Sequence, residues 1–171
     1  MKTRFAAIAL LVGTAAIGGC SKKAPEQLPP APEQDGTVTQ LPDRIPAGAV
    51  EGSHDHFVQQ VNGQNVIYFE TDRYNIDSAD AAALQTQAQY LMQYPDVRVT
   101  VEGHADERGT REYNLALGER RANAAKNYLV GIGIGANRIS TVSYGKERPV
   151  ALGSTEAAWA QNRRAVTVII N

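Results

Sequence analysis

Cysteine is almost absent from this sequence: its 171 residues include one. A single cysteine excludes a disulfide framework within one chain, and it excludes a cysteine-rich zinc site for the same reason. Neither positive nor negative residues are in clear excess, because the chain has 17 basic and 18 acidic residues. The chain therefore lacks the positive field that holds a nucleic-acid backbone, and that class of partner is excluded.

The sequence also lacks an apolar run of the roughly 20 residues that a bilayer-spanning helix needs. Its longest apolar stretch, residues 5–12, follows two basic residues and precedes IGGC at residues 17–20. This order is typical of a signal peptide, and small residues before a lone cysteine resemble a bacterial lipobox. We therefore expect residues 1–19 to be a signal peptide and Cys20 to carry acyl chains. The alternative is a soluble exported protein with an unmodified cysteine.

Proline is scarce outside one segment, because six of the eight prolines lie within residues 25–46. This part of the chain is rich in glutamine and charge, so it cannot bury enough apolar surface to offset its ordering entropy. We expect residues 20–49 to form a lipidated, flexible tether that the prolines bias toward extended polyproline II. Residues 50–171 then form one domain.

This domain alternates between strand and helix patterns. Short β-rich runs predict strands at residues 65–69, 97–102, 138–144 and 165–170. Apolar residues at helical spacing predict one helix around 81–91, with Ser78 as its N-cap, a second over 113–130, and a short one near 156–160. The order β-α-β-α-β-β predicts an α+β sandwich in which two helices pack on one face of a mixed sheet.

The densest polar cluster, residues 102–111, lies between the second predicted strand and the second main helix. Loops held between rigid elements often carry binding groups, and this one contains Asp106. Its glycines permit tight turns and a close approach of the backbone to a ligand. We therefore expect the functional site here.

The helix that follows directs an arginine toward this loop. We expect Leu115 and Leu129 to face the core. Asn114 and Arg121 then lie on the neighbouring stripe, from which both can converge on the loop. Arg120 is turned about 100° from Arg121, so the two arginines should not share one role.

Asp106 and Arg121 allow two interpretations. As a binding site they suit a zwitterion, because the aspartate can pair with an ammonium while the arginine grips a carboxylate through two hydrogen bonds. As a structural feature they form an ion pair that staples loop to helix, and most such surface pairs contribute roughly 0–1 kcal/mol. The residues alone leave both interpretations open.

The segment VTVEGHADERGTREYNLALGERRANAAKNYL, residues 99–129, resembles the peptidoglycan-associated lipoproteins of the OmpA C-terminal-like family. The similarity continues in YFETDRYNID at 68–77 and through residues 139–170, and the lipobox and proline-rich tether belong to it. The resemblance implies the OmpA C-terminal-like fold. It further implies non-covalent binding of peptidoglycan through the diaminopimelate of the stem peptide, with no cofactor or metal.

The resemblance also implies which residues bind. Its motifs place the two principal contacts at Asp106 and Arg121, in agreement with the helical-face argument. The same motifs assign further pocket residues: His104, Ala105, Arg108, Asn114, Leu117, Thr71 and Asp72. Thr71 stands where some relatives carry an aromatic residue. Residues 162–164 match the family ending, and a binding role and a packing role both stay open for them.

For the whole protein, the resemblance implies a place in the Tol-Pal envelope system, which acts in cell division and envelope integrity. The implied partner is the periplasmic Tol propeller protein. The implied location is the outer membrane, with a lipid anchor and the domain facing the periplasm; Ser21 after the cysteine favours that membrane by resemblance to other lipoproteins. The alternative is a generic OmpA-like wall tether without a Tol role.

Catalysis is not expected. His104, Asp106 and Glu107 lack the HExxH spacing of a zinc protease, and the chain lacks a nucleophile elbow. We expect His104 to form hydrogen bonds within its loop. We also expect residues 54–56, His-Asp-His, to be solvated rather than to bind a metal, and Trp159 to pack the final loop.

Overall fold

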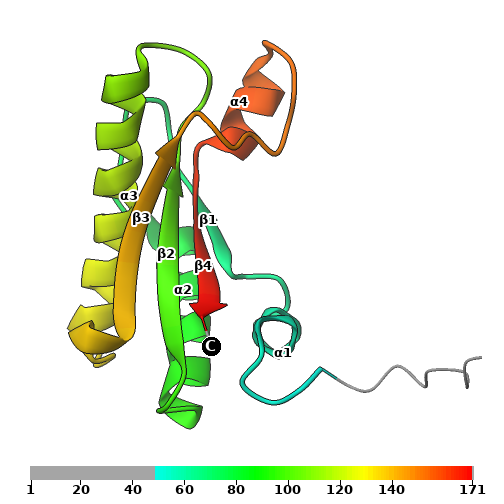
Figure 1. Cartoon of the computed structure of the whole chain (residues 1–171), viewed down its shortest axis with the longest axis vertical. Helices are drawn as coiled ribbons and strands as arrows, with labels where there is room; N and C mark the ends of the chain where they lie inside the picture. Colours follow the sequence, from blue (N-terminus) through cyan, green and yellow to red (C-terminus); the bar gives the residue numbers. More distant parts are fainter. Residues whose placement is uncertain (1–48, 171) are drawn as a thin grey trace, which may run out of the picture. The chain divides into compact units, whose positions relative to one another are not determined.

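The computed structural model describes residues 49–170, whose arrangement is shown in Figure 1. The predicted signal peptide, Cys20 and nearly all of the predicted tether lie outside the described residues. The elements follow in the order α1 (His54–Gln60), β1 (Val66–Tyr68), α2 (Ser78–Gln93), β2 (Arg98–His104), α3 (Arg111–Gly131), the 3₁₀ helix η1 (Ala136–Arg138), β3 (Ile139–Gly145), α4 (Glu156–Asn162) and β4 (Arg164–Ile170).

The four strands form one mixed sheet in the order β1-β4-β2-β3. β4 runs antiparallel to both β1 and β2, whereas β2 and β3 are parallel. The last strand in the sequence is therefore inserted between the first two. β1 and β2 must point the same way, so the loops that follow them emerge at one edge of the sheet. The predicted α+β architecture with a mixed sheet is confirmed.

Two element boundaries differ from the prediction. Asp77, not Ser78, caps α2, because the Asp77 carboxylate accepts a hydrogen bond of 2.8 Å from the backbone N–H of Asp80. A side-chain acceptor at this position satisfies an N–H that has no partner inside the helix. β2 continues through His104 and pairs on both sides up to Gly103, so residues 102–104 belong to the strand and not to the loop.

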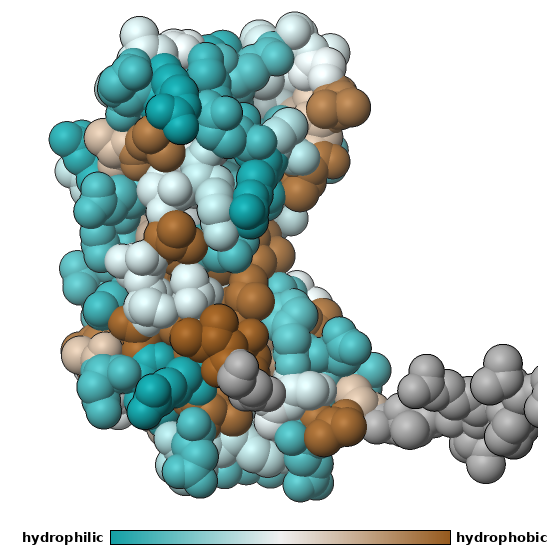
Figure 2. All heavy atoms as spheres, viewed as in Figure 1, coloured by the Kyte–Doolittle hydropathy of each residue, from teal (hydrophilic) through white to brown (hydrophobic). Residues whose placement is uncertain are grey.

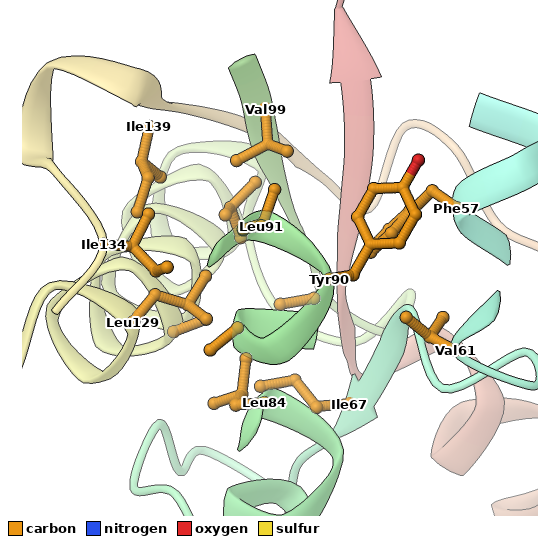
Figure 3. Packing of buried hydrophobic residues seen from close by; sticks show 14 of the residues in the cluster. Phe57, Val61, Ile67, Leu84, Tyr90, Leu91, Val99, Leu129, Ile134 and Ile139 are labelled. Carbon is orange, nitrogen blue, oxygen red and sulfur yellow. The ribbon is translucent and has the colours of Figure 1, made fainter. Parts of the chain in front are cut away.

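The core lies between the sheet and the two long helices. Leu84 and Leu91 of α2, Leu129 of α3 and Val99 of β2 are each at most 1% exposed and belong to one cluster, which Figure 3 shows. Full burial of such a side chain contributes about 1.5–3 kcal/mol. Because both helices share this cluster with the same side of β2, they pack on one face of the sheet, as predicted.

Glycines bring α3 close to the end of β2. A Cβ added to Gly103 of β2 would overlap the carbonyl oxygen of Gly118 in α3, so backbone meets backbone at this point. From β3, the Ser143 hydroxyl donates a 2.7 Å hydrogen bond to the carbonyl of Leu115. These contacts orient α3 so that the face containing Leu117 points inward, and Leu117 is 5% exposed. Leu115, which we expected in the core, is only half-buried.

The prediction that residues 54–56 are solvated was wrong for His56: these residues begin helix α1, in which Asp55 is exposed but His56 is buried. Ser53 caps this helix, and His56 and Phe57 are buried. The ring of Phe57 lies 5.0 Å from that of Tyr90 in α2, and Nδ1 of His56 lies 2.9 Å from the Tyr90 hydroxyl. A tyrosine of α2 thus provides a buried surface for this short segment.

The other face of the sheet is only partly covered. Along β4, Thr167 and Ile169 are buried under the helices, whereas Val166 and Val168 are half-buried and Ile170 is 46% exposed. Figure 2 shows hydrophobic residues among hydrophilic ones on the face turned to the viewer. Within residues 49–170, no helix combines the length and the apolar character that a bilayer span requires.

Candidate functional site

A cavity of about 240 Å³ lies where the loops after β1 and β2 meet the start of α3. Its walls contain eight of the nine residues assigned to a pocket from the sequence. The lining consists of Thr71, Asp72, Ala105, Asp106, Arg108, Gly109, Tyr113, Asn114, Leu117 and Arg121. Residues that are up to 50 positions apart in the chain are therefore brought together at one edge of the sheet.

Arg121 is the buried cation of this site. Its residue exposure is 0%, and its guanidinium donates to three backbone carbonyls: Nε to Arg73 at 2.9 Å, Nη1 to His104 at 2.8 Å and Nη2 to Glu70 at 3.1 Å. Burial, with Arg163 close by, lowers the pKa of Arg121 to about 10, so it stays charged at neutral pH. These bonds tie the loop after β1 to α3 and to the end of β2.

Asp106 is held by two other arginines. Its carboxylate accepts bonds from the Arg108 side chain at 3.0 Å (Nε to Oδ1) and 2.6 Å (Nη2 to Oδ2), and from the Arg108 backbone N–H at 3.1 Å. Nη1 of Arg163 lies 3.6 Å from Oδ2. Burial by itself raises the pKa of Asp106, but the bonds from Arg108 outweigh burial and hold the pKa below its ordinary value. Asp106 is therefore an anion at neutral pH.

The sequence left open an ion pair between Asp106 and Arg121 that would tie the loop to the helix. These two residues do not form that pair in the structure. The ion pairs of Asp106 in the described residues are with Arg108 and Arg163, and Arg121 bonds to carbonyl oxygens. Arg120 is exposed, with its guanidinium 5.9 Å from the Tyr74 ring. The prediction that neighbouring arginines point in different directions is confirmed.

Polar contacts brace the loop that carries Asp106. The Asn114 side chain, 2% exposed, donates to the carbonyl of Arg108 at 2.7 Å. Lys146 Nζ donates to the carbonyls of Glu107 and Gly109 at 3.1 and 2.7 Å. Gly109 has φ +83°, a backbone conformation that favours glycine. The backbone of this loop is thus fixed at several points.

His104 does not line the cavity with its side chain, in contrast to the prediction. Its imidazole is 2% exposed, lies against Tyr144 at 5.6 Å and has no hydrogen-bond partner among the described residues. The expected hydrogen bonds within the loop are therefore absent. Burial, with Arg164 and Arg148 nearby, lowers the pKa of His104 to about 4. His104 serves the site through its carbonyl, which accepts from Arg121.

Residues 162–164, whose roles the sequence left open, divide into different tasks. The Asn162 side chain accepts from the N–H groups of Val150 and Ala151 and donates to the Ala151 carbonyl, so it shapes that loop. Arg163 lies behind Asp106 and donates to the carbonyl of Phe69. In the sequence, only the position of Arg163 in the motif indicated that it belongs to the site. Its approach to Asp106 depends on the position of β4 between β1 and β2, which the sequence does not show.

The sequence reasoning named neither Tyr113 nor Gly109 as a pocket residue, although it noted that the loop glycines permit a close approach of the backbone to a ligand. The Tyr113 hydroxyl donates to Asp72 at 3.1 Å, and Gly109 forms part of the wall. Both fall inside the quoted loop-helix motif, which was the available signal. Trp159 of α4 lies near this loop as well, since its Nε1–H donates to Glu107 at 3.0 Å.

A larger cavity, about 430 Å³, lies beside the first and shares the loop after β1 as a wall. Its lining mixes aromatic, amide and charged side chains, but Asp106 and Arg121 are not among them. In the part of the chain that the structure describes, no three histidine, cysteine or carboxylate residues are placed to hold a metal ion. The smaller cavity therefore remains the candidate site.

Comparison with known proteins agrees with this architecture. The sequence model of the OmpA family matches residues 68–163. The chain is 48% identical over 160 residues to a protein of Rhizobium meliloti named peptidoglycan-associated lipoprotein, covering 93% of this chain and 84% of that one. It is 53% identical over 121 residues to the protein of the same name in Agrobacterium fabrum, covering 71% and 67% of the two chains.

A solved structure gives the same result. The crystal structure of the peptidoglycan-associated lipoprotein from Burkholderia pseudomallei matches with a TM-score of 0.63 and 44% sequence identity. The match covers 67% of this chain and 99% of that one. The matched part therefore corresponds to essentially the whole of the solved chain.

Proposed function

The chain belongs to the OmpA family, among relatives named peptidoglycan-associated lipoproteins, and from this we propose that it binds peptidoglycan non-covalently. The group that it recognises is the free end of diaminopimelate in the stem peptide. That end is a zwitterion, with an ammonium and a carboxylate on one carbon. The proposal assigns binding, not catalysis, to the cavity.

One observation carries the proposal: an ionised aspartate and a buried, charged arginine border the same small cavity. The three carbonyls that hold Arg121 use three of the five N–H donors of a guanidinium, which leaves two. We assign these two to the ligand's carboxylate, because a guanidinium can bind a carboxylate through two hydrogen bonds. Asp106 suits the ammonium, and the Asn114 amide, Leu117 and Ala105 complete the walls beside them.

We further propose that the protein is a lipid-anchored component of the outer membrane whose domain faces the periplasm and holds the cell wall. The names of the relatives and the IGGC motif support this, with Cys20 as the acylated residue. A single acyl chain gives marginal membrane binding, whereas several chains give stable anchoring. Intact mass should therefore show loss of residues 1–19 and addition of acyl groups. A mature chain with a free Cys20 thiol would contradict the anchor.

The proposed partner is the periplasmic Tol propeller protein, in a system that acts in cell division and envelope integrity. Support comes from the resemblance of the whole domain to the peptidoglycan-associated lipoproteins. Affinity capture of the protein from envelope extracts should recover the propeller protein. Recovery of cell wall without it would favour the generic wall tether.

The binding proposal is tested by changing the ligand, which leaves the protein intact. A stem peptide with lysine lacks the carboxylate that Arg121 would bind, so two N–H donors in a buried site lose their partner. We expect at least about tenfold weaker binding of the lysine peptide, or roughly 1.4 kcal/mol. Equal affinity for the two peptides would contradict recognition of the zwitterion.

Variants add a second test by co-sedimentation with purified peptidoglycan. Asp106→Ala should weaken binding by about 1.5–3 kcal/mol, the range for a hydrogen bond to a charged group. Glu119→Ala is the matched control, because it removes the same charge from an exposed residue that lies outside the cavity. Equal losses in the two variants would point to general charge effects and not to the site.

A further inference from the structure

The carboxylate that should receive the ligand's ammonium already holds a cation. Arg108 makes two side-chain bonds to Asp106, at 3.0 and 2.6 Å, and its Nη2 also lies 3.3 Å from the Thr71 hydroxyl. A guanidinium in this position occupies an acceptor position on each carboxylate oxygen. An ammonium that approaches Asp106 from the cavity must therefore compete with Arg108.

The three arginines around the site differ in their freedom to leave. Arg121 is fully buried and holds three carbonyls, and the Arg163 side chain is 5% exposed, with bonds to Phe69 and Glu156. The Arg108 side chain is 38% exposed. It can return to water without crossing the protein interior.

From this contrast we propose that Arg108 is a built-in counter-ion of Asp106, which the ammonium of the bound stem peptide displaces. The inference rests on the proposed function and adds to it: the site opens by exchanging one cation for another. Arg121 keeps its place during the exchange. Arg108 thus sets the affinity by competing with the ligand, not by contacting it.

The surroundings let the Arg108 side chain move while its backbone stays. Asn114 holds the Arg108 carbonyl at 2.7 Å, and Asp106 itself accepts the Arg108 backbone N–H at 3.1 Å. Departure of the guanidinium breaks two strong bonds and one long one to Thr71. Arg163 Nη1, buried and 3.6 Å from Asp106, still compensates the carboxylate when Arg108 has left.

The chain provides its own reporter for this exchange. The guanidinium of Arg108 lies over the ring of Trp159, 4.1 Å from its centre, and Trp159 is the sole tryptophan of the sequence. A cation this close to an indole interacts with its π-system. Movement of Arg108 should therefore change the intrinsic fluorescence of the protein.

The experiment titrates a soluble stem peptide that ends in meso-diaminopimelate into the wild type and three variants. Arg108→Ala should bind about two- to fivefold more tightly, since the partly exposed guanidinium of Arg108 no longer competes for the carboxylate. Asp106→Ala should bind more weakly. Arg111→Ala is the matched control: it removes the same charge from an exposed pair with Glu147 and should leave the affinity unchanged.

Fluorescence gives an independent readout. Peptide binding should change the emission of the wild type, and the emission of peptide-free Arg108→Ala should already resemble that of the bound wild type. Weaker or unchanged binding by Arg108→Ala, with its thermal midpoint intact, would overturn the exchange. So would constant wild-type emission at saturating peptide. If the wild type does not bind the peptide, or Asp106→Ala binds it equally well, the proposed function itself fails.

Discussion

Replacement of Arg121 should unfold the site before it tests the ligand. Its three hydrogen bonds of 2.8–3.1 Å end on buried or partly buried carbonyls, which Arg121→Ala would leave without a donor. Leaving a buried acceptor without its donor costs about 1–3 kcal/mol, and three are left here, against a total stability of about 5–15 kcal/mol for most domains. Arg121→Lys keeps the charge, but one ammonium cannot serve three carbonyls arranged around a planar fork, so we expect a loss of about 2–3 kcal/mol.

Urea unfolding and amide hydrogen exchange check this prediction together. The midpoints should fall in the order wild type, Arg121→Lys, Arg121→Ala, and exchange should accelerate in residues 70–73, the loop that Arg121 holds. Arg120→Ala, exposed and one position away, is the control and should change neither. If Arg121→Lys unfolded at the same urea concentration as the wild type, the three carbonyl bonds would not stabilise the domain.

Three further perturbations follow from the packing. Gly103→Ala should lower stability by several kcal/mol in thermal unfolding and displace α3, because its Cβ would overlap the backbone of Gly118. Stability should fall as the pH drops from about 6.5 toward 4, by at most about 3 kcal/mol, because the unfolded chain protonates His104 before the folded chain does; His104→Phe should flatten this slope in urea titrations. Asn162→Ala removes three hydrogen bonds to residues 150–151 and should cost about 2 kcal/mol while stem-peptide affinity stays unchanged; a loss of affinity would give Asn162 a part in binding.

The strands and long helices could be predicted because their signals are local. Alternating valines in β2 and the three-to-four spacing in α2 are visible in any short window of the sequence. Helix α1 was missed because its sequence, HDHFVQQ, is short and polar; its burial depends on Tyr90, a residue that lies about 30 positions away. Tertiary contact, not local pattern, decides such a segment.

The functional site, too, has parts that local sequence patterns predict and parts that depend on tertiary contacts. Helical spacing placed Asn114 and Arg121 on one stripe that faces the loop, and the structure agrees. The partners of Arg121 could not be foreseen, because backbone carbonyls carry no sequence signal and two of the three come from the loop after β1. The bond between Asp106 and Arg108 spans two positions, yet the sequence could not show whether the arginine faces the aspartate or the ligand.

If the cavity binds the stem peptide as proposed, the contrast between Arg121 and Arg108 would make that binding both selective and reversible. Arg121 is fixed by three carbonyls, so binding a carboxylate requires no further ordering of its side chain, and an unmatched ligand leaves buried donors without a partner. In the proposed complex we therefore assign selectivity for the zwitterion to Arg121. Asp106 keeps its charge through Arg108 in the empty site, and through the ammonium and Arg163 in the proposed complex. Because one cation replaces another, the carboxylate is never left uncompensated, and the ligand can leave as readily as Arg108 can return.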